Sequence, residues 1–507
     1  MRRLALALLL PGAAFAAEPA FLDRAGALPV AHVYSGGWEH FVGGGVAVFD
    51  CDGDALPEIL AAGGENPVSF FRNITPPGGD LRFATGAFPE LTGVTGAYPV
   101  DIDGDGHLDL AILRVGPNKL LKGGPDCEFT DATENWGIAA EDRWTTAFSA
   151  TWEPGNTLPT LAFGNYVDRA DPDGPFEACD TNQIYRPEGD RYGAAVDLSP
   201  GYCALSILFS DWSRRGRADL RLSNDRHYYV RGGSEQMWRP GENRFLGPDD
   251  GWDRISIWGM GIARRDLRGV GLADRPLTSP GDQKLQDGTG SGFVQLPYSA
   301  GATAHRPYLG DDGRPSTGWH AEFGDIDNDR RPDLFIAKGN VDQMPGNAMA
   351  DPNNLLMQTP EGRFVEYGAK AGIATTDRSR GAALADLNAD GRLDIVVVNR
   401  RAPMELWQNA TPPDNNWAAI DLSQPGPNPR AIGAWVELRT PGDGLVFTQE
   451  RTIGGGHAGG SALPLHFGLE TYAGAEARIT WPDGAVSPWI AVNTNATTTI
   501  TRASGSN

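Results

Sequence analysis

The chain is poor in cysteine and in long apolar segments. It has only four cysteines in 507 residues and no C-x-x-C pair, which argues against a thiolate metal site or a dithiol redox site. Beyond the N-terminus no stretch approaches twenty apolar residues, which argues against insertion into a membrane. The G-x-S-x-G, H-E-x-x-H and P-loop patterns are also absent, and the eight histidines are scattered. These absences weaken hydrolase and metalloprotease interpretations, and we do not expect an enzyme.

Positive charge is scarce as well. The formal net charge is −22, which argues against nucleic acid or an anionic membrane surface as a partner and favours cations. Glycine and proline are plentiful, with 66 and 38 residues, while hydrophobic residues still make up 40% of the chain. This composition is typical of an all-β protein with many tight turns.

The first 16 residues predict a secretory signal peptide. Arg2 and Arg3 precede a short apolar run over residues 4–10, and Ala14-Phe15-Ala16 offers a small-x-small cleavage site. A membrane anchor is the alternative, but the run is too short to span a bilayer. We therefore expect a periplasmic or secreted protein. In such an oxidising compartment Cys179 and Cys203, which flank one long loop, would pair, leaving Cys51 with Cys127 by elimination.

Four segments share one spacing of acidic or amide residues. They are FDCDGDALPEIL from Phe49, VDIDGDGHLDLAIL from Val100, GDIDNDRRPDLFIA from Gly324 and ADLNADGRLDIVVV from Ala385. Degenerate copies begin at Trp152, Asp211 and Asp266, so seven repeats follow one another at intervals of 51 to 61 residues. Near-regular repeats of this length predict the four-stranded blades of a seven-bladed β-propeller.

Each repeat is expected to supply a loop, two strands, a turn and an outer strand. The outer strands are marked by aromatic residues, namely Phe83, Phe129, Tyr192, Phe245 and Phe364. The seventh repeat has no such aromatic strand after residues 405–409, whereas Phe21-Leu22-Asp23 has the outer-strand pattern without a loop before it. We expect the N-terminus to complete the last blade and close the ring, which removes two exposed sheet edges.

The predicted domains are a propeller over residues 17–413, a small β-rich domain over residues 414–503 and a tail over residues 504–507. The second domain shows alternating strands and glycine-rich turns. His457 and His466 in it could be a ligand or an acid-base group, but packed or solvated histidines are the simpler interpretation.

The four acidic loops predict calcium sites. Oxygens at positions 1, 3 and 5, a backbone carbonyl at position 7 and a carboxylate at position 9 suit a hard cation that takes six to eight oxygen ligands. The predicted ligands are Asp50, Asp52, Asp54, Leu56 and Glu58; Asp101, Asp103, Asp105, His107 and Asp109; Asp325, Asp327, Asp329, Arg331 and Asp333; and Asp386, Asn388, Asp390, Arg392 and Asp394. We expect about four Ca²⁺ ions, with a structural role, and none in the degenerate loops.

The spacing of the acidic loops does not fit an EF-hand. An EF-hand needs a Glu at position 12 and helices on both sides, but position 12 is apolar here and the flanks resemble strands. Ion-free hairpin turns held by Asx side chains are the simpler alternative to calcium sites, although the same spacing occurs four times.

The loops resemble the FG-GAP or VCBS-type repeats of integrin α-chain propellers. The C-terminal segments AIGAWVELRT, GGGHAGGSALPLHFGL and ITWPDG, within residues 431–484, resemble the ASPIC/UnbV domain. Together they resemble the cartilage acidic protein family, whose bacterial members are exported and whose animal members are extracellular matrix proteins. The resemblance implies calcium binding and extracellular interaction, without a defined reaction.

Two functions remain open from the sequence. The first is an extracytoplasmic binding, adhesion or scaffold protein with a protein or glycan partner. The second is a propeller enzyme acting on a polysaccharide, as a hydrolase or lyase, with two carboxylates converging on the central channel. Candidates for the second are Asp211, Asp219, Asp225, His227 and His320, although ordinary turn and surface roles are simpler. Trp258 and Trp319 could face a ligand, but core packing is the safer expectation for both.

Overall fold

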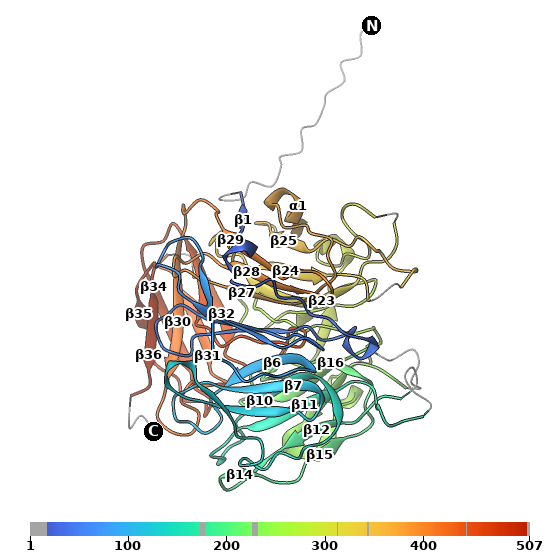
Figure 1. Ribbon diagram of the computed structural model, residues 1–507. Helices are drawn as coiled ribbons and strands as arrows, with labels where there is room; N and C mark the ends of the chain where they lie inside the picture. Colours follow the sequence, from blue (N-terminus) through green and yellow to red (C-terminus); the bar gives the residue numbers. More distant parts are fainter. Residues whose placement is uncertain are drawn as a thin grey trace.

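Seven blades of antiparallel strands follow one another along the chain in the computed structural model (Figure 1). The structure describes residues 18–172, 178–225, 232–311, 313–341, 344–442 and 444–503. The predicted signal peptide, the tail at residues 504–507 and His227 lie outside the described residues. The fold class is all-β as predicted: the one α-helix among the described residues is the short α1 (Gly368–Ala371).

In each of the first three blades the strands follow the chain from the innermost strand to the outermost one. Blade 1 consists of β2 (Val46–Phe49), β3 (Glu58–Ala61), β4 (Ser69–Asn73) and β5 (Phe83–Thr85). Blade 2 consists of β6 (Val94–Val100), β7 (Asp109–Gly116), β8 (Lys119–Gly123) and β9 (Phe129–Asp131). Blade 3 consists of β10 (Arg143–Thr151), β11 (Thr160–Asn165), β12 (Asn182–Tyr185) and β15 (Val196–Leu198), with a side hairpin of β13 (Pro187–Glu188) and β14 (Arg191–Tyr192). Pairing of β7 with β10 joins blades 2 and 3 into one continuous sheet.

The next four blades complete the ring. Blade 4 consists of β16 (Ala204–Ser210), β17 (Asp219–Asn224), β18 (Gln236–Arg239) and β19 (Arg244–Phe245). Blade 5 consists of β20 (Arg275–Leu277), β21 (Lys284–Gly288) and β22 (Phe293–Gln295), and blade 6 of β23 (Gly318–Gly324), β24 (Asp333–Lys338), β25 (Asn354–Gln358) and β26 (Phe364–Glu366). Blade 7 consists of β27 (Ser379–Ala385), β28 (Asp394–Asn399), β29 (Glu405–Asn409) and β1 (Phe21–Asp23). In the described part of the chain six 3₁₀ turns lie between strands, at Ala25–Ala27, Trp38–His40, Pro125–Cys127, Pro240–Glu242, Pro248–Asp250 and Tyr298–Ala300.

The N-terminal strand closes the ring as predicted. β1 pairs antiparallel with β29, and Phe21 lies opposite Asn409 (Figure 1). Apolar clusters then bridge successive blades all the way round: one joins blades 7, 1 and 2, and others join blades 2 and 3, 3 and 4, 4 and 5, 5 and 6, and 6 and 7. Because each inner strand is packed on both faces, these strands read as continuous apolar runs such as Val46–Phe49, which is buried throughout.

Two details of the blades differ from the prediction. Tyr192 was expected to mark the outer strand of blade 3, but it lies in the β13–β14 hairpin, and β15 is the strand that pairs with β12. The Tyr192 ring is still buried, at 5% exposure, in the cluster between blades 2 and 3. The aromatic signal therefore identified a core side chain and placed it on the wrong strand, because a hairpin is inserted before β15.

Blade 5 lacks a regular inner strand among the described residues. Only the isolated bridges Ile262 to Leu277 and Arg265 to Asp274 stand in its place. Pro276 in β20 has no N–H for the ladder, and the N–H and C=O of Ile262 bond to Gly456 instead of a full strand partner.

The C-terminal domain packs two sheets face to face. One sheet contains β30 (Asn416–Ser423), β33 (Leu465–Glu470) and β36 (Thr497–Thr501), and the other β31 (Trp435–Arg439), β32 (Val446–Glu450), β34 (Ala475–Thr480) and β35 (Ile490–Val492). A core of its own, which includes Ile420, Val436 and Ile479, lies between them. Figure 1 shows these orange and red strands against one side of the propeller.

A loop of the C-terminal domain fills the centre of the propeller. We name residues 453–463, between β32 and β33, the central loop. Its backbone forms isolated bridges with the innermost segments of five blades, at Phe49, Ala97, Ala150, Leu208 and Ile262. His457 then reaches blade 6, where its backbone N–H donates to His320 Nδ1 at 3.1 Å and its ring lies 4.8 Å from that of Trp319. The two domains are therefore one folded unit.

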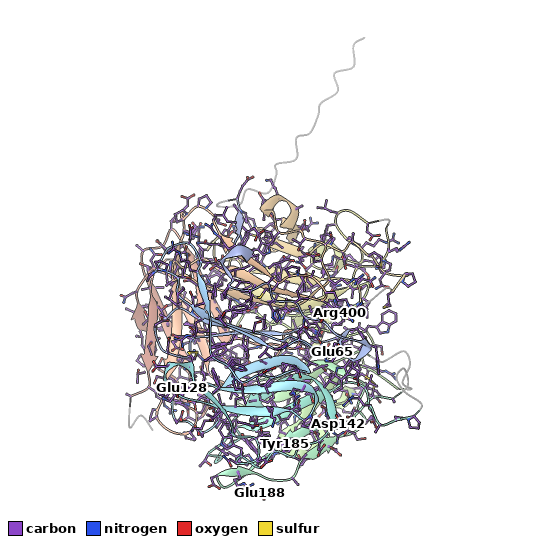
Figure 2. All side chains as sticks on the ribbon, viewed as in Figure 1. Glu65, Glu128, Asp142, Tyr185, Glu188 and Arg400 are labelled. Carbon is purple, nitrogen blue, oxygen red and sulfur yellow. A yellow bond between two sulfur atoms is a disulfide. The ribbon has the colours of Figure 1, made fainter. Side chains whose placement is uncertain are left out.

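The propeller has two different faces. The loop between the first and second strands of each blade opens toward the C-terminal domain, and the turn after the second strand opens away from it. Figure 2 labels Glu128, next to Cys127, on the side of the C-terminal domain, and Glu65 and Arg400, which follow second strands, on the other side. We call the first side the loop face.

Candidate metal centres

The four acidic loops share one hydrogen-bonding pattern. The carboxylate at position 1 accepts two backbone N–H groups from within its own loop; Asp101, for example, accepts those of Gly104 and Gly106 at 2.8 and 3.1 Å. The carboxylate at position 9 lies at the start of the second strand and accepts one N–H from the loop and one from the third strand. Asp109 accepts from Ile102 at 2.7 Å and from Gly123 at 2.8 Å. Equivalent bonds are made by Asp50, Glu58, Asp325, Asp333, Asp386 and Asp394.

The backbone of these loops has positive φ at positions 4 and 6. In the second loop these are Gly104 and Gly106, with φ of 72° and 93°. The degenerate fourth repeat keeps the same geometry at Arg214 and Gly216, and the fifth keeps it at Gly269 and Gly271. The alignment of these degenerate repeats is therefore confirmed in the backbone, and their carboxylates at positions 1 and 9 keep a structural role: Asp211 still accepts the N–H of Gly216 at 2.7 Å.

Position 3 distinguishes the acidic loops from the degenerate ones. Its oxygens have no hydrogen-bond partner among the described residues at Asp103 Oδ1, at both oxygens of Asp327 and at Asn388 Oδ1. Asp327 is only 4% exposed. A buried carboxylate without a partner is costly. A cation bound at position 3 would offset this cost.

Three loops bring their acids together. Oxygens of Asp50, Asp52 and Glu58 lie within 4.8 Å of one another, as do those of Asp101, Asp103 and Asp109 and those of Asp325, Asp327 and Asp333. Several clusters could thus hold a metal ion, and an all-oxygen donor set suits a hard cation such as calcium. The fourth loop does not meet this criterion, because Asn388 donates to Asp390 at 3.0 Å and an amide replaces one carboxylate.

The remaining predicted ligands lie in the same loops. Asp54, Asp105, Asp329 and Asp390 at position 5 each accept the backbone N–H of position 7, at 2.8 to 3.0 Å. The carbonyl groups of Leu56, His107, Arg331 and Arg392 at position 7 stay predicted ligands.

Basic side chains contact the loops and were missed from the sequence. Arg72 pairs with Asp52, and Lys122 pairs with Asp103 and, at 2.8 Å, with Asp105. In the degenerate loops the guanidinium of Arg239 lies 3.2 Å from Asp219, and that of Arg268 lies 3.4 Å from Asp274. These arginines offset the negative charge of the position 9 carboxylate in the repeats that have no acid at positions 3 and 5. Arg72, Lys122 and Arg239 lie on the third strands of their blades, so the loop spacing does not mark them, whereas Arg268 is at position 3 of its own loop.

Burial changes the acidity of the loop carboxylates. Desolvation raises the pKa of Glu58 to about 7, that of Asp109 to about 8 and that of Asp329 to about 9. Neighbouring aspartates add to the effect at Asp109 and Asp329. Full ionisation of these loops is therefore unfavourable by itself, and a divalent cation would offset the repulsion.

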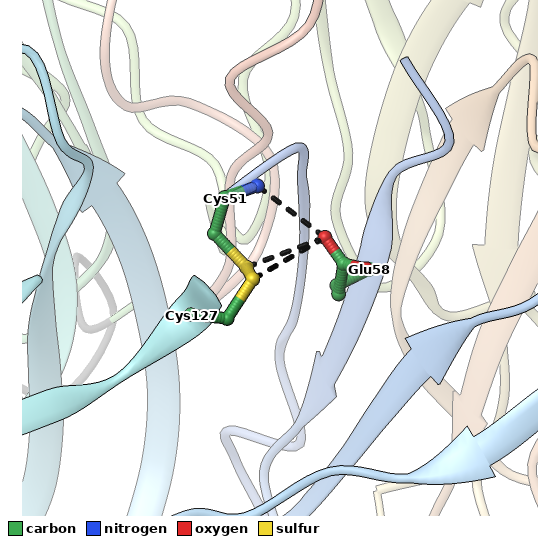
Figure 3. Close-up of side chains that lie close together, drawn as sticks. All are labelled: Cys51, Glu58 and Cys127. Atoms are coloured by element: carbon green, nitrogen blue, oxygen red, sulfur yellow. Dashed lines mark hydrogen bonds between the residues drawn. A yellow bond between two sulfur atoms is a disulfide. The ribbon is translucent and has the colours of Figure 1, made fainter. Parts of the chain in front are cut away.

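A disulfide lies against the first loop. Cys51, at position 2, bonds to Cys127 in the 3₁₀ turn of blade 2, with Cα atoms 5.1 Å apart. Glu58 Oε2 accepts the backbone N–H of Cys51 at 3.3 Å, and both sulfurs lie close to this oxygen (Figure 3). The second disulfide joins Cys179 and Cys203. Both predicted pairs are thus confirmed.

The candidate catalytic residues are held by other contacts. Asp219 accepts from Trp212 Nε1 at 2.8 Å, Asp225 accepts from the hydroxyl of Tyr166 at 2.5 Å, and His320 lies 3.3 Å from Glu322 Oε2. Among the described residues, none of them belongs to a group of three or more acidic, histidine or cysteine side chains whose ligand atoms lie within 4.8 Å of one another. Trp319 is fully buried and Trp258 half-buried. His457 and His466 are packed: Gly43 N–H donates to His457 Nε2 at 3.2 Å, and His466 Nε2 lies 3.1 Å from the carbonyl oxygen of Gly391.

Two family models match the chain. The FG-GAP-like repeat matches residues 50–112 and 325–397, which contain the four acidic loops, and the model named ASPIC and UnbV matches residues 424–507. The repeat type and the C-terminal domain predicted from the sequence are therefore confirmed. No curated protein sequence matches the chain. Among the described residues, no helix is long and apolar enough to cross a membrane.

Several solved structures are similar in fold. BBS1N in complex with ARL6DN is 10% identical, with a TM-score of 0.45 over 77% of this chain and 97% of that one. An Agrocybe aegerita lectin that recognises non-reducing terminal N-acetylglucosamine is 14% identical, with a TM-score of 0.40 over 70% and 88%. A Bacillus licheniformis rhamnogalacturonan lyase is 12% identical, with a TM-score of 0.36 over 77% and 75%.

Proposed function

We propose that this chain is an exported, calcium-binding β-propeller of the cartilage acidic protein family that acts as an extracytoplasmic binding, adhesion or scaffold protein through contacts with a protein or glycan. The observation that carries the proposal is the set of position 3 oxygens without a partner among the described residues, above all those of the buried Asp327. In the second and third acidic loops this position 3 carboxylate, Asp103 or Asp327, converges with two further carboxylates.

The calcium would be structural. Four ions, one in each acidic loop, would neutralise carboxylates whose other oxygens already bond to the backbone. Each ion would then tie the first strand of a blade to the second and, through position 9, to the third. With about five protein ligands at each ion, little of the coordination shell remains for a substrate.

Export is supported by the N-terminal sequence and by the two disulfides. Disulfides persist in oxidising compartments. The periplasm or the exterior of the cell is therefore the proposed location.

Binding is favoured over catalysis because the central loop occupies the middle of the propeller. A polysaccharide hydrolase or lyase in the channel would need two facing carboxylates with room for the sugar between them. Residues 453–463 instead bridge to the inner segments of five blades.

Calorimetric melting with calcium and with a chelator tests the proposal. An ion at a hundred times its Kd stabilises the folded state by about 2.7 kcal/mol, so four ions should raise the melting temperature by on the order of ten degrees or more. Magnesium at equal concentration is the control, since it fits such large oxygen cages poorly. Identical melting curves in calcium and in chelator would overturn the proposal.

A further inference from the structure

A cavity of about 790 Å³ lies between the loop face and the C-terminal domain. Its size falls within the range of about 300 to 1,000 Å³ that is typical of ligand sites. The loops of blades 1, 2, 3 and 7 form one wall, each with its position 1 residue, namely Asp50, Asp101, Trp152 and Asp386. Residues of the C-terminal domain form the other wall. The cavity thus exists only because the two domains pack together.

Arg430 lines this cavity and forms no ion pair among the described residues. Two other arginines of the lining are satisfied: Arg265 donates to the carbonyl oxygen of His466 at 3.1 Å, and Arg451 pairs with Asp421 at 2.6 Å. The buried Nε of Arg430 has no hydrogen-bond partner in the described part of the chain. Arg451, Asp421, Asp101 and Asp50 act on it only through space. A guanidinium left with free donors in a part-buried cavity is suited to an anionic oxygen acceptor.

Trp152 supplies a second free donor. It replaces the position 1 aspartate in the third repeat, so the loop that lost its ion ligands places an indole in the cavity. The buried Nε1 of this indole has no hydrogen-bond partner among the described residues. Buried indole N–H groups usually find an acceptor. The opposite wall adds the side chains of Thr497 and Thr499, whose hydroxyls can both donate and accept.

We propose that this interdomain cavity binds a small carboxylate-bearing saccharide, with its carboxylate on Arg430 and its ring oxygens or hydroxyls on Trp152 and the threonines. The inference rests on the proposed function, because calcium in the first, second and fourth acidic loops would neutralise the aspartates that otherwise repel such a ligand. A uronic acid combines one negative charge with several hydroxyls in a compact volume, and it therefore matches both the guanidinium and the hydroxyl-lined wall. An acidic peptide would leave most of these hydroxyls without partners.

Isothermal titration calorimetry of the full chain in calcium tests the site with digalacturonate, neutral cellobiose and triglutamate as probes. We expect digalacturonate to bind and cellobiose to bind at least tenfold more weakly. Arg430→Gln should weaken digalacturonate binding by about 10- to 100-fold, which is the usual effect of losing a charge-assisted hydrogen bond. Trp152→Phe, which keeps the ring and removes the N–H, should weaken it by about fivefold. Arg439→Gln is the matched control, because Arg439 pairs with Glu476 at 2.6 Å outside the cavity and its loss should leave binding unchanged.

The outcomes separate this inference from the proposed function. Arg430 is not a predicted calcium ligand, so Arg430→Gln should keep the calcium-dependent shift of the melting curve, which also shows that the variant folds. If the native chain shows that shift but binds no digalacturonate, the cavity proposal is wrong and the calcium proposal stands. Equal binding of triglutamate and digalacturonate, or full binding by Arg430→Gln, would also overturn the assignment of the site.

Discussion

Cys51 and Cys127 join the first acidic loop to the neighbouring blade. The loop residue at position 2 is thereby fixed to the turn of blade 2, beside Glu58 at position 9 (Figure 3). The two cysteines are 76 residues apart in the sequence, so the bond also closes a long segment of the unfolded chain. The disulfide therefore contributes both to global stability and to the shape of one proposed calcium loop.

Replacing both residues, Cys51→Ser with Cys127→Ser, should lower the free energy of unfolding by about 4 kcal/mol, from the closure of a loop of this length. It should also weaken calcium binding at the first loop, which loses its tether. Denaturant titration and calcium titration measure the two effects. The matched control is Cys179→Ser with Cys203→Ser, whose 24-residue separation predicts a smaller loss of stability and unchanged calcium binding. Unaltered calcium affinity in the first pair would show that the tether does not shape the loop.

Asp327→Asn should remove one calcium ion and lower the melting temperature in calcium by several degrees. In chelator the variant should melt at the same temperature as the native chain or at a higher one, because it removes a buried charge that has no hydrogen-bond partner among the described residues. Metal analysis and melting in both buffers measure this. Asp211→Asn, at position 1 of a degenerate loop, is the control for stoichiometry and should leave the number of bound ions unchanged. A variant that keeps the full number of ions would contradict the role of position 3.

Much of the fold was predictable because it is local and repeated. The spacing of the repeats found all seven blades, including the three degenerate ones, and in the fourth repeat the positive φ at positions 4 and 6 persists at Arg214 and Gly216. The pairing of the N-terminal strand with the last blade was predictable, because the segment at Phe21 has the outer-strand pattern with no loop before it. The inserted hairpin at Tyr192 was not, because aromatic burial does not specify which strand carries the ring.

The site was predictable only in part. The spacing of the predicted ligands in each loop can be read from the sequence. The contacts of Arg72 and Lys122 with the acids cannot, because they depend on how the third strand of the blade packs. The central loop was missed entirely. Its glycines, such as Gly459, are needed because a Cβ there would lie 2.2 Å from the carbonyl oxygen of Val46 in another domain, and no local pattern encodes that approach.

Three buried histidines each contribute a loss of stability in acid. Burial lowers the pKa of His32 to about 4, that of His457 to about 3 and that of His466 to about 4. Between pH 6.5 and about 4 the unfolded chain therefore binds protons that the folded chain does not, so this stability is complete above pH 6.5 and is lost as the pH falls. Each histidine contributes about 1.4 kcal/mol per pH unit in that window.

Denaturant titration in calcium at pH 7.5, 6.0 and 5.0 measures this loss. His32→Gln should reduce the loss of stability per pH unit by the contribution of one histidine. Glutamine keeps hydrogen-bonding capacity toward Ser69 and Ala62 but takes up no proton. A slope that is the same in native protein and in His32→Gln would contradict the assignment.

The central loop should be essential for docking of the C-terminal domain, and Gly96→Ala tests this. Gly96 lies in β6, and a Cβ there would lie 1.7 Å from the carbonyl oxygen of Ala458. Because Gly96 has no positive φ, alanine fits the strand itself, and the substitution acts on the contact with the loop alone. We expect a loss of at least about 1–3 kcal/mol in the free energy of unfolding and faster proteolytic cleavage between the domains. Gly241→Ala, where a Cβ would meet nothing within 4 Å, should be neutral in both measurements. If Gly96→Ala keeps native stability and protease resistance, the contact between Gly96 and the central loop is not required for docking of the C-terminal domain.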